Sequence, residues 1–138
     1  MNALPNRRIE DWKYSDLQNA IDADAVASAP TAAWAVVSAS GAADIGDLPA
    51  ILPRGAHGAM AEIAMELAKA GPCVRVARNG NGVAHLALTE GGHGRALIVV
   101  EDGASLALQE TIQATYFANI AVEIVLGENA RLTHVRHA

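Results

Sequence analysis

One cysteine and a small number of histidines and carboxylates are the side chains of this sequence that could serve a chemical site. Cys73 is the single cysteine, so the chain cannot form an intrachain disulfide and its cysteine content does not require an oxidising compartment. It follows Gly71-Pro72 at the start of an alternating segment, with no histidine close to it in the sequence. We therefore interpret Cys73 as a buried or half-buried small apolar side chain, rather than as a sulfur acceptor or metal ligand.

The histidines near the end of the sequence do not have the spacing of a metal site. Side chains three apart on a strand, such as His134 and His137, point to opposite faces. In an internal repeat described below, His134 falls at the position of Leu88 and Leu108, which predicts an imidazole pointing inward from an aliphatic ladder. We favour a neutral ring bonded to backbone groups over a cluster ligand or a proton carrier.

The other candidates form no catalytic pattern. His57 and His93 stand beside glycines and are interpreted as loop or cap residues. The glycine-rich stretches 79–82 and 90–94 are predicted turns, because neither leads into a helix or contains the Gly-Lys-Ser/Thr of a phosphate-binding loop. Spacing singles out no Ser-His-Asp or paired-carboxylate constellation. We predict a protein that is not an enzyme, with no catalytic, cofactor-binding or metal-ligating residues.

The elements that would position these residues begin with a helix and a linker. Ser15 and Gln18 have the spacing of a capping box, which predicts a short helix over residues 16–21. Residues 22–32 lack a period and contain a proline, as is typical of a linker. A brief strand is predicted for residues 34–37.

The clearest helical pattern covers residues 57–70. Apolar side chains recur there at i, i+3, i+4 and i+7, in Met60, Ile63, Ala64 and Leu67. Gly71-Pro72 ends the pattern, because glycine accepts a left-handed cap and proline cannot continue a helix. From Cys73 onward the period becomes 2, so we predict only strands and turns in the second half.

The second half also repeats itself. The Leu-Ala-Leu at 86–88 recurs at 106–108, and segment 98–106 matches segment 124–132 at a longer interval. A loop within 110–119 would absorb the unequal spacing. Repeats of strand, polar turn and strand predict stacked parallel rungs, with three inward leucines above one another at Leu86, Leu106 and Leu132.

The turn residues agree with this repeat. Asp102-Gly103 and Glu128-Asn129 occupy equivalent places, and Gly, Asn and Asp tolerate a positive φ. We therefore predict a mainly β fold, a parallel β-helix of few rungs. A barrel or sandwich would explain the strands, but neither predicts the same unit twice in register.

The composition narrows the class further. The length of 138 residues suits one ordinary domain, and the core must be built from small aliphatic side chains because aromatics make up 4% of the residues. The net charge of -5 argues against a nucleic-acid partner, which requires a dense positive surface. The amino-terminal residues are charged early and no long apolar run follows, so we predict no membrane association and a cytoplasmic location.

Three segments resemble the SufB/SufD family of iron-sulfur cluster assembly proteins, especially its SufD-type members. Residues 4–17, which include Trp12-Lys13-Tyr14, resemble the opening of those proteins, and segments 96–104 and 122–136 are similar to the first turns of their core. The resemblance implies a helical amino-terminal region, here residues 1–72, that leads into a right-handed parallel β-helix, here residues 73–138.

The resemblance also implies a function. It predicts a noncatalytic scaffold component of the SUF system, acting through contacts with SufB-like and SufC-like proteins. Family members are much longer, and their ATPase-docking region and late Cys and His positions have no counterpart in this sequence. We therefore expect no cofactor, and no cluster held stably by the isolated chain.

Two alternatives and one further expectation remain open. The chain could be a truncated SufD homologue serving as a separate interaction module, or a β-helical carbohydrate-active enzyme that uses Glu110 and Glu123. No cap follows the last predicted strand, residues 130–136. We therefore expect self-association through this open carboxy-terminal rung, most simply as a symmetric dimer.

Overall fold

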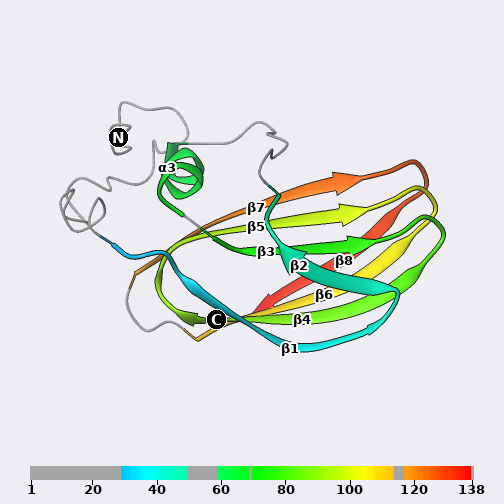
Figure 1. Cartoon of the computed structure of the whole chain (residues 1–138), viewed down its shortest axis with the longest axis horizontal. Coiled ribbons are helices and arrows are strands. Elements are labelled where there is room, and N and C mark those ends of the chain that lie inside the picture. The colour runs from blue at the N-terminus through cyan, green and yellow to red at the C-terminus, as the bar shows by residue number, and fades with distance from the viewer. Residues whose placement is uncertain (1–28, 50–58, 69, 114–116, 138) are drawn as a thin grey trace.

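The computed structural model describes residues 29–49, 59–68, 70–113 and 117–137. In these residues the chain is mainly β, with two four-stranded sheets and one short helix outside them (Figure 1). This confirms the predicted mainly β class. The expected helix over 16–21 and His57 lie outside the described residues.

The strands divide between two facing sheets. Sheet A has the spatial order β2 (Ala43–Asp47), β3 (Pro72–Val76), β5 (Gly92–Val100) and β7 (Ala118–Leu126). Sheet B has the order β1 (Ala33–Gly41), β4 (Asn81–Glu90), β6 (Ser105–Ile112) and β8 (Arg131–His137). From β3 to β8 the chain passes alternately from one sheet to the other (Figure 1).

Both sheets are mixed. β3, β5 and β7 pair in parallel, as do β4, β6 and β8, whereas β2 pairs antiparallel with β3 and β1 antiparallel with β4. The antiparallel pairs correct the expectation of a purely parallel stack. Their cause is the direction of crossing. At Gly41 the chain passes from sheet B to sheet A. The later turns lie at the same end of the strands but pass in the opposite direction, from sheet A to sheet B.

The same two strands extend the sheets before the predicted division at residue 73. The brief strand expected at 34–37 is the longer β1, and β2 follows it directly, so part of the region 1–72 that was expected to be helical consists of strands. The predicted 110–119 loop is also shorter, because β6 continues to Ile112 and β7 begins at Ala118.

Three turns of similar shape carry the chain from sheet A to sheet B. Each contains one residue with a positive φ, at 61° in Asn79, 69° in Gly103 and 59° in Asn129. Glycine and asparagine adopt this left-handed conformation at lower cost than other residues. The predicted equivalence of Asp102-Gly103 and Glu128-Asn129 is confirmed, and Asn79 belongs to a third turn of the same kind.

Backbone hydrogen bonds join these turns in a stack. The amide of Asn79 donates to the carbonyl of Asp102 at 3.0 Å, and the amide of Gly103 donates to the carbonyl of Glu128 at 2.9 Å. The Asp102 side chain also accepts from the Glu128 amide, at 2.8 Å. The polar backbone of the turns is therefore paired from one turn to the next.

The stacked turns set a register that differs in part from the predicted one. The match of 98–106 with 124–132 is confirmed, since Ile98 pairs with Ile124 and Leu106 with Leu132. The match of 86–88 with 106–108 is wrong. Gly82 is the residue beside Leu106, so the three leucines Leu86, Leu106 and Leu132 do not stack. The Leu-Ala-Leu motif occurs twice at positions that are not equivalent, and the turns decide the alignment.

The core lies between the sheets and consists of aliphatic side chains of alternate strand positions. Its fully buried members are Val74, Val76, Ala84, Leu86, Ile98, Val100, Ala104, Leu106 and Leu108. β5 is an exception to the alternation, because nearly all of its residues are buried. Its outer face is covered as well.

The helix α3 (Ala59–Leu67) covers that outer face, against β5 and β7 (Figure 1). It lies within the predicted range 57–70, and Ile63 and Ala64 of the predicted apolar stripe are fully buried. The helix therefore covers a sheet face. Among the described residues, no helix has the length and apolar character required to span a bilayer.

The left-handed turns yield a prediction about stability. Asn129→Ala should destabilise the fold by about 1 kcal/mol, because a Cβ-bearing residue without a local hydrogen-bonding side chain disfavours positive φ, whereas Asn129→Gly should be close to neutral. Urea unfolding followed by circular dichroism gives both values. Glu128→Ala, one residue earlier in the same turn, is the matched control. Equal effects of the alanine substitutions at 128 and 129 would contradict the role assigned to the turn.

Candidate functional site

A buried carboxylate lies in the interior between the sheets. Glu110 follows Leu106 and Leu108 at alternate positions of β6, so it points inward with them, and it is 1% exposed. The parallel register places Leu86 beside it on one side and Arg136 on the other. An isolated charge in such a place is strongly unfavourable, so its partners decide whether the arrangement is stable.

Two side chains of β8 supply those partners. One carboxylate oxygen of Glu110 contacts Nε2 of His134, and the other accepts from Nη2 of Arg136 at 3.3 Å. The His134 side chain is 24% exposed and that of Arg136 is 44% exposed, so the cluster links the buried interior to solvent at the β8 side. It ties the edge strand β8 to its neighbour β6 by charge as well as by backbone pairing.

This cluster corrects the interpretation of His134. The predicted position is right, because His134 pairs with Leu108 and points inward. Its equivalence with Leu88 is wrong, since Leu88 pairs with Ile112, and the contacting group is a carboxylate rather than a backbone group. The sequence signal was the i, i+2, i+4 spacing of Glu110 with two leucines, which the assignment of Glu110 to a loop obscured.

A second polar cluster attaches α3 to sheet A. Nε of Arg95 donates to Glu123 at 2.9 Å, and Nη1 of Arg95 donates to the carbonyl of Met65 at 3.4 Å. Nδ2 of Asn119 donates to the carbonyl of Met60 at 2.8 Å. Side chains of β5 and β7 therefore hold two backbone carbonyls of α3, which gives these buried groups a structural role.

His93 belongs to the same region and is not a loop or cap residue. It lies in β5, fully buried, with Nδ1 3.3 Å from Nδ2 of Asn119. Its ring meets that of Phe117 edge to face, with 5.4 Å between the centroids. The glycines on either side of it do not mark a loop, because Gly92, with φ 134°, and Gly94 belong to the same strand.

The two carboxylates considered for a carbohydrate-active site lie on different sides of the structure. Glu110 points into the interior, whereas Glu123 is paired with Arg95 beneath α3 on the outer face of sheet A. They cannot flank one glycosidic bond, as paired catalytic carboxylates must. Of the two glycine-rich stretches predicted as turns, 79–82 contains a turn at Asn79-Gly80 that leads into β4. In 90–94 the prediction is wrong, because Glu90 ends β4, residues 92–94 belong to β5, and Gly91 alone lies between the strands.

Cys73 lies in β3, half-buried, between Gly46 of β2 and Leu97 of β5. Burial raises the pKa of its thiol, Arg75 opposes this, and Asp44 adds to it. A raised pKa leaves less thiolate at neutral pH, and thiolate is the form that attacks sulfur or binds metal. In the described part of the chain, no three His, Cys, Asp or Glu side chains are grouped to hold a metal ion.

Sheet edges provide the remaining candidate surface. β7 and β8 are edge strands of the two described sheets, on the same side of the stack. Ile124 and Leu126 of β7 occupy positions that are interior in the neighbouring strand, yet they are 45% and 49% exposed. An edge with unpaired backbone groups and exposed apolar side chains favours pairing with another strand.

Comparisons with known proteins add no assignment: no protein-family model, curated protein or solved structure matches this chain.

The interior cluster generates a stability prediction. Glu110→Gln keeps the shape but removes the charge that His134 and Arg136 contact, so we expect a loss of about 1–3 kcal/mol in the free energy of unfolding. The control is Glu101→Gln, because Glu101 is 40% exposed and 3.9 Å from Arg75. Its effect should be below about 0.5 kcal/mol. Similar urea midpoints for the two variants would contradict the structural importance of the Glu110 cluster.

The raised pKa of Cys73 predicts its alkylation profile. The rate of reaction with iodoacetamide should reach half its maximum at a higher pH in the folded chain than in the urea-unfolded chain, because burial disfavours the thiolate. Asp44→Asn should lower that midpoint and Arg75→Gln should raise it. A folded midpoint at or below the unfolded one would show an activated thiol and reverse the interpretation.

Proposed function

We propose that this chain is a noncatalytic scaffold component of the SUF iron-sulfur cluster assembly system. It acts in the cytoplasm through contacts with SufB-like and SufC-like proteins. The proposal starts from the resemblance of residues 4–17, 96–104 and 122–136 to SufD-type proteins.

One observation carries the proposal beyond the resemblance. Segment 96–104 and residues 122–130 of segment 122–136 occupy equivalent places in the fold, since β5 and its turn lie beside β7 and its turn in parallel register. Strands β3 to β8 alternate between the sheets and pair in parallel within each of them. We interpret these strands as the rungs of a right-handed parallel β-helix, to which β1 and β2 add an antiparallel edge.

The β7 and β8 edge is the surface we assign to partner contact. It combines the exposed Ile124 and Leu126 with unpaired backbone of two strands. A SufB-like strand or a second copy of the chain could pair there. A symmetric, antiparallel β8 pair would bring Arg131 and Arg136 of one copy near the arginines of the other, which disfavours that form of the dimer at low ionic strength.

The other two readings differ from this one in what they require. A carbohydrate-active enzyme needs two carboxylates on one face, and Glu110 and Glu123 lie on different sides. A separate interaction module would use the same edge strands with a partner outside the SUF system. Only the identity of the captured protein distinguishes that reading from ours.

Affinity capture tests the proposal. A tagged chain expressed in cells with SufB-like and SufC-like proteins should retain both through washing, and Ile124→Lys should reduce their recovery because it places a charge in the apolar edge. Val36→Lys is the matched control, since Val36 is 54% exposed on β1 at the opposite edge. A folded chain that captures neither protein, or equal losses with both lysine variants, would reject the proposed contact.

A further inference from the structure

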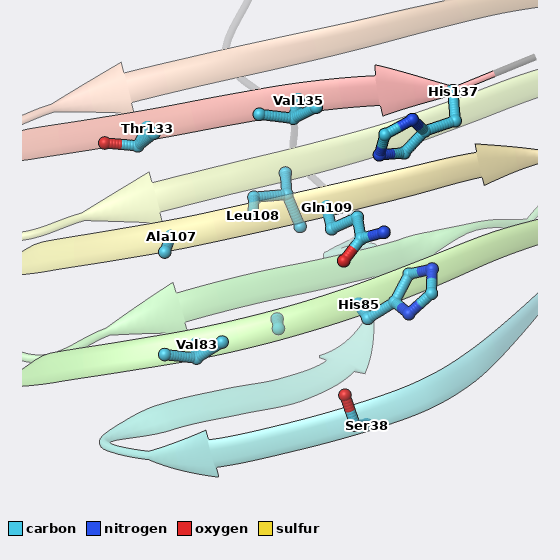
Figure 2. A pocket seen from close by; sticks show the side chains of 10 residues that line it. Ser38, Val83, His85, Ala107, Leu108, Gln109, Thr133, Val135 and His137 are labelled. Carbon is cyan, nitrogen blue, oxygen red and sulfur yellow. The ribbon is translucent and has the colours of Figure 1, made fainter.

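The outer face of sheet B contains a trough that the proposed scaffold role does not use. Two adjoining hollows of about 340 and 350 Å³ lie on this face, and both are bordered by Val83, Ala107 and Thr133. Figure 2 shows the larger set of lining side chains, which come from all four strands of the sheet. Together the hollows follow the direction of β6 from its turn toward the other end of the strand.

The depth of the trough follows from side-chain size. Ala107 of the inner strand β6 has Val83 of β4 and Thr133 of β8 as its direct neighbours, so a small side chain lies between two larger ones. A strand rises about 3.3 Å per residue, so the lining spans about 20 Å between the levels of Arg131 and His137, with the Gln109 side chain between His85 and Val135 beyond Ala107. This length matches about six residues of an extended peptide.

The chemistry of the lining differs from end to end. Arg131 lies at the turn end, where the Ser105 hydroxyl donates to Oδ1 of Asn81 at 2.6 Å. The middle is apolar, with Val83 52% exposed. At the far end the ligand would meet hydroxyl, imidazole and amide groups, in Ser38, His85, Gln109 and His137 (Figure 2).

None of the described residues that line the trough is a carboxylate, although the whole sequence has a net charge of -5. The two carboxylates of the sheet B strands, Glu90 and Glu110, line neither hollow, and Glu110 is turned into the interior. Among the described residues that line the two hollows, Arg131 is the one lysine or arginine. An anionic group would be favoured at that end, and an acidic ligand would lie beside no carboxylate of the described lining.

We propose that this trough binds an extended acidic peptide segment, with small apolar side chains over Ala107 and a carboxylate beside Arg131. The polar groups at the other end would pair with the backbone amides of the segment. One arginine is too little for a nucleic-acid backbone, and the described lining residues include no Phe, Tyr or Trp on which a sugar or base would stack. This inference does not depend on the iron-sulfur role.

Fluorescence anisotropy with the folded chain tests the inference. The probe is a fluorescein-labelled peptide of repeated Glu-Val-Ala, compared with the same peptide built from Lys-Val-Ala. The acidic peptide should bind saturably and the basic one should not. Arg131→Glu should weaken binding by about fivefold or more, since it replaces an attraction by a repulsion, and Ala107→Phe should abolish it by filling the trough.

Two variants on the outer side of sheet A serve as matched controls. Arg75→Glu makes the same charge reversal at an exposed arginine, and Val125→Phe adds an aromatic ring at a position 39% exposed. Both should bind the acidic peptide like the unaltered chain. Circular dichroism is to check that Ala107→Phe is folded, and Arg131→Glu tests the charge separately at an exposed position. Equal binding of both peptides, no binding, or equal losses in the controls would overturn the proposal.

Discussion

The left-handed backbone at Asn79, Gly103 and Asn129 is the constraint on which the arrangement of both sheets depends. Each of these residues reverses the chain at the same end of the strands, and the turns are hydrogen-bonded to one another through backbone amides and carbonyls. Because side chains alternate along a strand, a fixed turn also fixes which residues point inward on both flanking strands. The aliphatic core therefore follows from the turns as much as from the apolar pattern.

The same register creates the one charged position in the described core. On β6 the inward sequence is Leu106, Leu108 and Glu110, so the third member brings a carboxylate into an aliphatic column beside Leu86. Hydrophobic replacement of such a group often costs little stability, whereas the loss of one partner leaves an uncompensated charge. We infer that Glu110 specifies which strand occupies the place of β8, since that strand must present both His134 and Arg136 to this carboxylate.

The sequence predicted those features that depend on local residue types. The 3.6-residue period located α3, the period of 2 located the strands after Cys73, and Asp102-Gly103 and Glu128-Asn129 were recognised as equivalent turns. The predictions that were wrong concern features that depend on pairing between distant segments. A repeated Leu-Ala-Leu outweighed the turn at Asn79, which misaligned β4 with β6 and concealed the environment of Glu110. The antiparallel β1 and β2 left no repeat to detect, because they cross between the sheets in the opposite sense.

The connections at the two ends of the strands differ in how they would tolerate changes of chain length during evolution. At the end where the turns of Asn79, Gly103 and Asn129 lie, each turn is hydrogen-bonded to the next. One inserted residue would break these bonds and would exchange inner and outer positions in the strand that follows. At the other end of the strands, the connection from β6 to β7 is already longer than that from β4 to β5, since Leu88 pairs with Ile112 and Gly92 with Ala118. Insertions and deletions among relatives should therefore accumulate in the connections at this second end of the strands. An engineered epitope or a grafted peptide should also be tolerated there.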